Sequence, residues 1–297
     1  VGIGGENLIK IIPYRQGDVY PMRKEMTSWE GDLTLPDRFL MDRYDTMPEW
    51  KPRVWHLDLE WDPKEDFTTV IGIADNYSDE RIAFCWSEES AESLGDDEFI
   101  ETIRSMSWEN SKGVESTVKY RRVLCNSEAS IYREFLAYLE KCDPDVLVAH
   151  ALMWADLPHL MRRLENPDRL SPVGQVVRPF KTNDGYKDTQ QPIKGRLCWD
   201  SAVGWKSGSG FETLWQKSGR GQLPNRKLNT IAELLGLGSK LTEEVEGMTV
   251  HNGWDDYYDS FIDYCLRDTT LLASIAERLY AIDFFVAMQQ LCGVSWA

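Results

Sequence analysis

The stretch Val54-Trp55-His56-Leu57-Asp58-Leu59-Glu60-Trp61 decides the fold that we expect for this chain. Its valine, leucine and aromatic residues predict a buried strand. Residues two apart on a strand point to the same face of a sheet, so Asp58 and Glu60 are expected to lie side by side. Acids on an exposed strand would only contact water, but an unpaired carboxylate in a core is very costly. The stretch therefore predicts a cation beside Asp58 and Glu60.

Further acids with a similar placement follow later in the chain. Asp156 stands at the expected start of a helix, where an aspartate can also serve simply as the N-cap. Tyr264 and Asp268 are four apart on a helix expected over about 256–281, so they are neighbours on its surface. Carboxylate oxygens suit hard divalent ions such as Mg²⁺ or Mn²⁺, and paired ions of this kind promote in-line attack on a phosphodiester.

In this order the acidic segments resemble the ExoI, ExoII and ExoIII motifs of the 3′→5′ proofreading exonuclease domain of family B DNA polymerases. The segments are Asp58-Leu59-Glu60, residues 146–158 with their closing Asp-Leu-Pro, and Tyr264-Cys265-Leu266-Arg267-Asp268. The resemblance implies an α/β fold of the ribonuclease-H-like type, in which helices flank a mixed sheet, with a small N-terminal appendage. The exonuclease domain of that family belongs to the four-carboxylate exonuclease group whose third motif carries a tyrosine.

The resemblance also implies an enzyme, a metal-dependent 3′→5′ exodeoxyribonuclease that releases 5′-mononucleotides from single-stranded or frayed DNA. Two Mg²⁺ ions, for which Mn²⁺ would substitute, are expected to be held by Asp58, Glu60, Asp156 and Asp268. Tyr264 is expected to orient the attacking water. The expected partners are the 3′ end of single-stranded DNA and, through polymerase domains that this chain lacks, a primer-template duplex; no membrane partner is expected.

The second motif departs from the family at two positions. Ala151 stands where the family has an asparagine, and Ala155 stands where it has a phenylalanine. Both family residues help to hold the 3′ end, so the departures predict weaker positioning of the substrate. Trp154 is expected either to pack in the core or to replace the missing ring by stacking on a base, which is worth about 1–3 kcal/mol.

Three other features bear on substrate contacts. Trp61 directly follows the first motif and is a candidate contact. Leu228 lies in Lys227-Leu228-Asn229-Thr230-Ile231, which resembles a small DNA-contact motif of the family with Lys227 in place of its hydroxyl residue. His150 and His159 flank the second motif, and we expect packing or hydrogen bonding from them, since Tyr264 occupies the position of the histidine used in a related branch.

The chain is expected to contain three parts. Residues 1–49 resemble the N-terminal segment of a family B polymerase, residues 50–281 the exonuclease domain, and residues 282–297 the start of the connection toward a polymerase domain. The palm signatures of the polymerase are absent from the sequence. Because the chain starts without methionine, we expect it to be a fragment or a processed product.

The hydrophobic pattern predicts the order of the elements. An antiparallel meander is followed by an acidic, serine-rich insertion that ends near residue 118, and then by alternating helices and strands. The expected strands are 53–61, 68–75, 81–86, 146–150 and 195–200; the expected helices are 127–142, one from about 156, 228–235 and 256–281, with an apolar helix over 281–293.

Composition limits the classes of protein. The net charge of −16 argues against a general nucleic-acid coat, which needs a basic surface, but it permits a metal-loaded cleft that takes one strand end. The six cysteines form no Cys-x-x-Cys pair, which excludes a zinc site by spacing and fits a cytoplasmic or other reducing compartment. No apolar run is long enough to span a membrane, and no signal peptide is recognisable.

Two alternatives remain open. One is a freestanding exonuclease of the same group that acts on RNA or short oligonucleotides. The other is a catalytically silent ribonuclease-H-like module, which would explain the alanines at 151 and 155 but not the complete set of carboxylates.

Overall fold

Most of the chain after residue 50 is described by the structure, a computed structural model. The chain divides into two compact units, a larger unit of residues 51–282 and a second one of residues 1–50 and 283–296. Apart from Arg43, the appendage expected at residues 1–49 lies outside the described residues. The described residues are 43, 51–109, 115–177, 181–182, 185–186, 191–204, 212, 215–241, 245–249 and 251–292.

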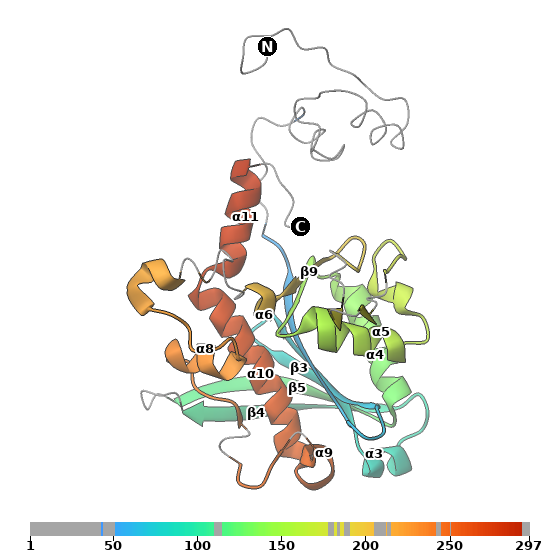
Figure 1. Cartoon of the computed structure of the whole chain (residues 1–297). Helices are drawn as coiled ribbons and strands as arrows, with labels where there is room; N and C mark the ends of the chain where they lie inside the picture. The colour runs from blue at the N-terminus through green and yellow to red at the C-terminus, as the bar shows by residue number, and fades with distance from the viewer. Residues whose placement is uncertain are drawn as a thin grey trace, which may run out of the picture. The chain divides into compact units, whose positions relative to one another are not determined.

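A seven-stranded mixed sheet forms the centre of the larger unit (Figure 1). Its strands are β1 (Val54–Trp61), β2 (Thr68–Asp75), β3 (Arg81–Trp86), β4 (Phe99–Glu109), β5 (Glu115–Cys125), β6 (Val146–Ala149) and β9 (Leu197–Asp200). They lie in the order β4-β5-β3-β2-β1-β6-β9. The pairs β1–β2, β2–β3 and β4–β5 are antiparallel, whereas β3–β5, β1–β6 and β6–β9 are parallel. This mixed sheet with flanking helices is the ribonuclease-H-like α/β fold that the sequence predicts.

Helices and short segments join these strands. The α-helices are α3 (Glu88–Ser93), α4 (Glu128–Cys142), α5 (Leu157–Arg163), α6 (Ser201–Gly204), α8 (Leu228–Leu234), α9 (Gly253–Asp256), α10 (Tyr258–Arg278) and α11 (Ala281–Cys292). Two π-helical turns, η2 (Leu152–Asp156) and η4 (Gln216–Arg220), a 3₁₀ turn η3 (Pro167–Leu170) and a small hairpin of β7 (Lys181–Thr182) and β8 (Gly185–Tyr186) complete the set. Within the described part of the chain, none of the helices has the length and apolar character needed to cross a bilayer.

Most predicted elements are confirmed, with small changes at their ends. Helix α4 begins after the N-cap Ser127, whose side chain accepts a hydrogen bond from Ser130 N. The long helix expected over about 256–281 is α10, which begins at Tyr258, one residue after the short helix α9, and ends at Arg278. Tyr280, with φ of +52°, ends α10 before α11 begins, since this left-handed conformation cannot continue a right-handed helix.

The acidic stretch between β3 and α4 is more regular than predicted. It was expected to be an insertion, but it contains α3 and two long antiparallel strands, β4 and β5. Strand β5 pairs in parallel with β3 from Arg81↔Tyr120 to Trp86↔Cys125, so the hairpin extends the central sheet. Polar residues alternate along these strands because β4 is an edge strand and part of β5 faces solvent, which is why the sequence lacked a clear buried-strand pattern.

The central sheet separates two hydrophobic cores. The β1 residues Trp55, Leu57 and Leu59 pack into the core beneath α4 and α5. The intervening residues, which include Asp58 and Glu60, face the opposite side of the sheet, where α10 lies across β1 and β2 (Figure 1). The period of two therefore places both acids of the first motif beneath the helix that carries the third.

Helix α10 approaches the sheet closely at Gly72, the residue opposite Asp58 on β2. A Cβ atom at Gly72 would lie 2.8 Å from the sulfur of Cys265, nearer than real carbon atoms come. The Cys265 thiol in turn donates to the backbone oxygen of Asp58 at 3.4 Å. Glycine at position 72 therefore lets the helix contact the strand directly beside the first motif.

Candidate active site

The first and third motifs meet between β1 and α10. Asp58 and Glu60 are half-buried on β1, while Tyr264 and Asp268 are buried one turn apart on α10, with exposed fractions of 5 % and 3 %. Two carboxylate oxygens, Asp58 Oδ2 and Asp268 Oδ1, are buried without a hydrogen-bond partner. Buried oxygens of this kind are costly, so the site is suited to a ligand that would satisfy them.

Asp156 follows β6, the strand that pairs in parallel with β1. It is 7 % exposed and ends η2, the π-helical turn through which the chain passes from β6 into α5. Although Asp156 occupies the N-cap position of α5, its side chain makes no capping hydrogen bond. Helix capping, the alternative role considered for Asp156, is therefore not supported by its contacts, and π-helical turns occur often at functional sites.

The predicted acids influence one another's pKa values. Burial raises the pKa of Asp58 well above its usual value, and the nearby charges of Glu60, Asp268 and Asp156 raise it further. Burial and the charge of Asp268 raise the pKa of Glu60 to about 8. Burial and a fifth carboxylate, Asp200, raise the pKa of Asp156 to about 7. Each of the four predicted ligands thus influences the charge of at least one other, and we call these four residues the carboxylate cluster.

Lys240 enters this cluster and was not predicted as a site residue. Its ammonium donates to Asp268 Oδ2 and lies 3.2 Å from the Tyr264 hydroxyl. Burial lowers the pKa of Lys240, but the charges of Asp268 and Asp58 outweigh this and raise it overall, so the amine stays charged. The backbone of Lys240 is fixed by a 2.7 Å hydrogen bond from its N–H to Asn229 Oδ1 at the start of α8.

The chemistry of the donors fits a hard divalent ion, but the described residues do not present a finished site. No group of three or more Asp, Glu, His or Cys side chains among them is arranged to hold a metal ion. The donors nevertheless consist of oxygen, and Asp58 and Asp268 each keep a buried oxygen without a partner. Lys240 is the main positive charge that acts on Asp268, and Arg267 adds a smaller one.

The three candidate substrate contacts lie in different environments. Trp61 is half-buried at the end of β1, and its ring stacks on the buried imidazole of His159 at 4.5 Å. Trp154 is 55 % exposed, so it does not pack in the core. Leu228 begins α8 and is only 5 % exposed, which places it among the packed residues of the domain.

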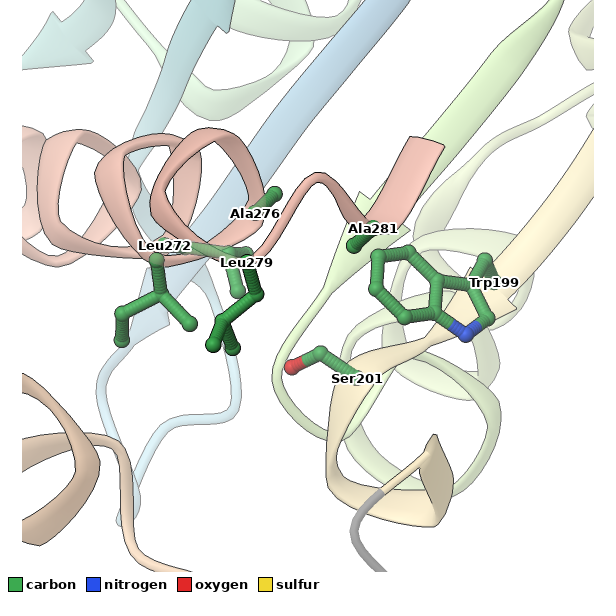
Figure 2. Close-up of a pocket in the computed structure, with 7 residues that line it drawn as sticks. Trp199, Ser201, Leu272, Ala276, Leu279 and Ala281 are labelled. Carbon is green, nitrogen blue, oxygen red and sulfur yellow. The ribbon is translucent and has the colours of Figure 1, made fainter. Parts of the chain in front are cut away.

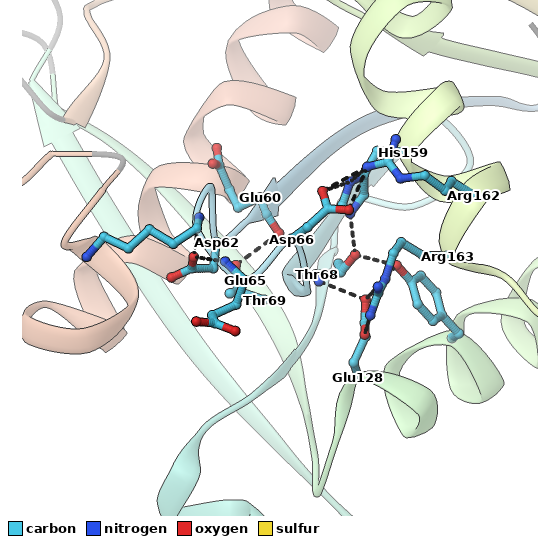
Figure 3. A network of polar contacts seen from close by, with 12 residues as sticks. Glu60, Asp62, Glu65, Asp66, Thr68, Thr69, Glu128, His159, Arg162 and Arg163 are labelled. Carbon is cyan, nitrogen blue, oxygen red and sulfur yellow. Dashed lines mark hydrogen bonds and ion pairs between the residues drawn. The ribbon is translucent and has the colours of Figure 1, made fainter. Parts of the chain in front are cut away.

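His159 belongs to a polar network beside the cluster (Figure 3). Arg162 donates to its Nδ1 at 3.1 Å, so Nε2 carries the proton and donates to Thr68 Oγ1 at 2.8 Å. Burial and then Arg162 lower the pKa of His159 to about 4, and the ring is neutral near pH 7. The carboxylate of Glu60 takes no part in the contacts drawn in Figure 3.

His150 is also hydrogen-bonded, as predicted. Its Nδ1 lies 2.9 Å from the hydroxyl of Ser201, and burial lowers the pKa of the imidazole to about 4. Ser201 in turn lines a small apolar pocket between α10, the first residue of α11 and the end of β9 (Figure 2). None of the predicted site residues lines this pocket, so it is separate from the carboxylate cluster.

Asp200 is the second residue that the sequence interpretation missed. It ends β9, directly beside Ala149 at the end of β6, and β6 leads to Asp156. The carboxyl ends of parallel strands meet at one edge of a sheet, so an acid that closes a predicted strand was a usable signal. Lys240 carried no comparable signal, because it follows the glycine-rich segment Gly236-Leu237-Gly238-Ser239 outside any regular element.

Comparison with known proteins gives no family for the chain: no protein-family model matches it, and no curated protein matches it.

The raised pKa values predict how stability depends on pH without metal. The folded-state pKa values of Glu60, about 8, and Asp156, about 7, lie above their ordinary values, so the folded state binds more protons than the unfolded state. Stability is then lost as pH rises through these values. Histidines with lowered pKa values act in the opposite direction, but only below their ordinary value of 6.5.

We therefore expect the melting temperature in chelator to fall between about pH 6.5 and pH 8, the interval set by these pKa values. Calorimetry at several pH values in buffers of low heat of ionisation measures the slope. The variant Asp58→Ala with Glu60→Ala should show a clearly smaller slope over the same interval. A melting temperature that rises with pH in the unchanged protein would contradict the electrostatics of the carboxylate cluster.

Proposed function

We propose that this chain is a metal-dependent 3′→5′ exonuclease that removes nucleotides from single-stranded or frayed DNA. The observation that supports it most is the meeting of Asp58, Glu60, Asp156 and Asp268 beside Tyr264. Burial of so many acids is costly and serves no packing purpose, whereas perturbed carboxylates grouped beside a tyrosine are typical of a functional site.

Within this proposal the four carboxylates would hold two Mg²⁺ ions. Such ions would supply a water molecule of lowered pKa and a positive charge for the leaving 3′ oxygen of a phosphodiester. The two buried oxygens without partners, Asp58 Oδ2 and Asp268 Oδ1, are the first candidates to act as ligands. Asp156, which follows β6 beside β1, is the remaining candidate ligand.

Two further residues act through protons and charge. Burial and the charge of Asp268 raise the pKa of Tyr264, so its hydroxyl remains protonated and can orient a water molecule. Lys240 donates to that hydroxyl at 3.2 Å and also to Asp268, which fixes both groups. In this account Lys240 offsets part of the negative charge before metal binds.

We further propose that the chain is the proofreading part of a family B DNA polymerase. Its support is the order and spacing of the three motifs and the flanking segments noted in the sequence. A mismatched primer end unpairs more easily than a matched one, so an exonuclease that accepts only a single strand removes it preferentially.

The direct test is digestion of a 5′-labelled single-stranded DNA in Mg²⁺ or Mn²⁺, resolved on a sequencing gel. We expect a ladder that shortens from the 3′ end and releases 5′-mononucleotides. Chelator and a blocked 3′ end should each stop the reaction. The same assay with an RNA strand of the same sequence tests the alternative enzyme. Faster digestion of RNA than of DNA would indicate a ribonuclease of the same group.

The control is the variant Asp58→Ala with Glu60→Ala, purified in parallel to reveal any contaminating nuclease. Shortening from the 5′ end, or digestion that persists in chelator, would refute the assignment. A folded protein that binds single-stranded DNA but never cleaves it would favour the catalytically silent module.

Ala151 allows a second test, which concerns the grip on the substrate. It adopts φ of +119°, a backbone conformation that favours glycine over residues with a Cβ atom. Ala151→Asn should add the side chain that holds the 3′ end in the family and leave the backbone strain at this position in place. We expect the single-turnover rate on single-stranded DNA to rise about tenfold, which corresponds to about 1.4 kcal/mol of transition-state stabilisation.

Ala151→Gly is the matched control, because it relieves the strain without adding a side chain. It should raise the melting temperature slightly and leave the rate unchanged, since removing a left-handed alanine recovers about 1–2 kcal/mol before the entropy cost of glycine is subtracted. Metal affinity should be equal in both variants. If glycine accelerates the reaction as much as asparagine does, strain and not grip limits the rate.

A further inference from the structure

Asp200 lies beside the carboxylate cluster but differs from its members. It is 5 % exposed at the end of β9, in register with Ala149 at the end of β6. Its negative charge is one of the causes that raise the pKa of Asp156. The negative charge of Asp200 beside Asp156 is unfavourable, so Asp200 requires contacts that stabilise it there.

The hydrogen bonds of Asp200 show what it holds. Oδ2 accepts from the backbone N–H of Met153 at 3.0 Å and from the indole Nε1 of Trp154 at 2.8 Å. Oδ1 accepts from the backbone N–H groups of Ala202 at 3.0 Å and Val203 at 3.4 Å. Both oxygens are engaged with donors of the chain, so Asp200 differs from Asp58 and Asp268, each of which keeps an oxygen without a partner.

Trp154 is the unusual partner in this set. Its side chain is 55 % exposed, yet its polar edge is tied to a buried carboxylate. The same carboxylate fixes the backbone of the preceding residue, Met153, inside the turn η2 that ends at Asp156. An exposed aromatic ring is therefore held in one orientation two residues from a member of the carboxylate cluster.

We propose that Asp200 is a positioning residue that fixes Trp154 as a stacking platform for a base at the 3′ end of the substrate strand. The inference rests on the proposed exonuclease function and names the group that grips its substrate. Every base has a flat face, so stacking on an indole is strong and tolerant of sequence. A ring fixed in advance binds more tightly than a mobile one, because less side-chain freedom is lost on binding. Ala155, the neighbouring residue, offers no ring that could serve instead.

The platform is tested by binding in chelator, where no strand is hydrolysed. The probes are two single-stranded DNA oligonucleotides, one with 2-aminopurine at its 3′ end and one with an abasic 3′ end. We expect the unchanged protein to prefer the base-bearing strand by about tenfold, as one stacked base provides, and to quench 2-aminopurine fluorescence. Trp154→Ala should bind both strands equally and lose the quenching.

Tyr77→Ala is the matched control. Tyr77 is 54 % exposed, similar to Trp154, but it follows β2 at the end of the sheet remote from Glu60, as the pairing of Trp55 with Asp75 shows. This variant should keep both the preference for the base and the quenching. If Trp154→Ala keeps the preference as well, the platform does not exist.

The role of Asp200 is tested by Trp154→Phe and Asp200→Asn, singly and together. Trp154→Phe keeps a ring but removes the N–H that Asp200 accepts, and it leaves the other three hydrogen bonds of Asp200 intact. Each single variant should lower the preference for the base about threefold, within the range of one stacked base. The double variant should be no worse than Trp154→Phe alone, because that variant already lacks the N–H through which Asp200 orients the ring. Independent, multiplying losses would show that Asp200 does not act through Trp154.

Turnover separates this inference from the proposed function. In Mg²⁺, Trp154→Ala should raise KM about tenfold and leave the single-turnover rate at saturation nearly unchanged, as expected for lost binding of one base. A preference for the base in chelator with no cleavage in Mg²⁺ would refute the exonuclease but leave the platform. Cleavage with normal KM in Trp154→Ala would refute the platform but leave the exonuclease.

Discussion

Replacing Asp58 and Glu60 together by alanine should reduce cleavage of single-stranded DNA by a factor of about one thousand or more. Both side chains lie on β1 beneath α10, and in the proposed mechanism they are metal ligands. Loss of metal-ion stabilisation removes several kcal/mol from the transition state, and each 1.36 kcal/mol corresponds to about a factor of ten in rate. Single-turnover kinetics at saturating Mg²⁺ measures the loss.

The same variant should be more stable than the unchanged protein in chelator. Burial and the charges of neighbouring acids, Asp268 and Asp156 among them, raise the pKa values of both residues, so their charged forms disfavour the folded state near pH 8. Their removal is expected to stabilise the fold by about 1 kcal/mol, or about 2–4 °C in melting temperature. Glu65→Ala, which removes an exposed acid shortly after β1, should change neither rate nor stability. Cleavage retained in the double variant would show that the first motif has no catalytic role.

Replacing Lys240 by methionine should have the largest effect on stability. Lys240 is the cation that contacts Asp268, and its side chain is 27 % exposed. Removing one partner of a buried ion pair leaves the other charge uncompensated, which costs about 3–5 kcal/mol when both are fully buried. Because Lys240 is partly exposed, we expect the free energy of unfolding of the variant to be lower by about 2–3 kcal/mol in chelator at pH 8. Urea denaturation measures this difference directly.

Added metal should act differently on this variant and on its control. With the lysine absent, divalent ions bind a more negative cluster, so saturating Mg²⁺ should stabilise Lys240→Met more than the unchanged protein. Lys240→Arg keeps the charge and should lose much less stability in chelator. A Lys240→Met variant as stable as the unchanged protein at pH 8 without metal would mean that the ion pair with Asp268 contributes nothing.

The fold was largely predictable because its central strands have a strong pattern. Strand β1 alternates between apolar residues that enter the core beneath α4 and α5 and residues that face α10, and its apolar residues are clear in the sequence. The hairpin of β4 and β5 was missed because one of its strands is at the sheet edge, so neither face is uniformly apolar. The pattern of a sequence reports burial, and edge strands are only partly buried.

The candidate site was predictable only in part. Asp58, Glu60, Asp156, Tyr264 and Asp268 form recognisable motifs, and the structure brings them together. Lys240 and Asp200 act through contacts between distant segments, since Lys240 lies 28 positions before Asp268 and Asp200 lies 46 positions after Trp154. No local spacing reveals such partners. Leu228, by contrast, matched a short motif but lies packed within the domain.

Because Cys265 on α10 packs against Gly72 on β2, its thiol can report on separation of the helix from the sheet. The Cys265 thiol is fully buried between β2 and α10, and burial raises its pKa well above the usual value, so it cannot react while the helix lies on the sheet. The rate at which a small reagent alkylates Cys265, followed by peptide mass spectrometry, therefore measures how often α10 separates from the sheet. This rate in the presence and absence of Mg²⁺ would measure, without any substrate, how firmly bound ions lock the two halves of the carboxylate cluster together.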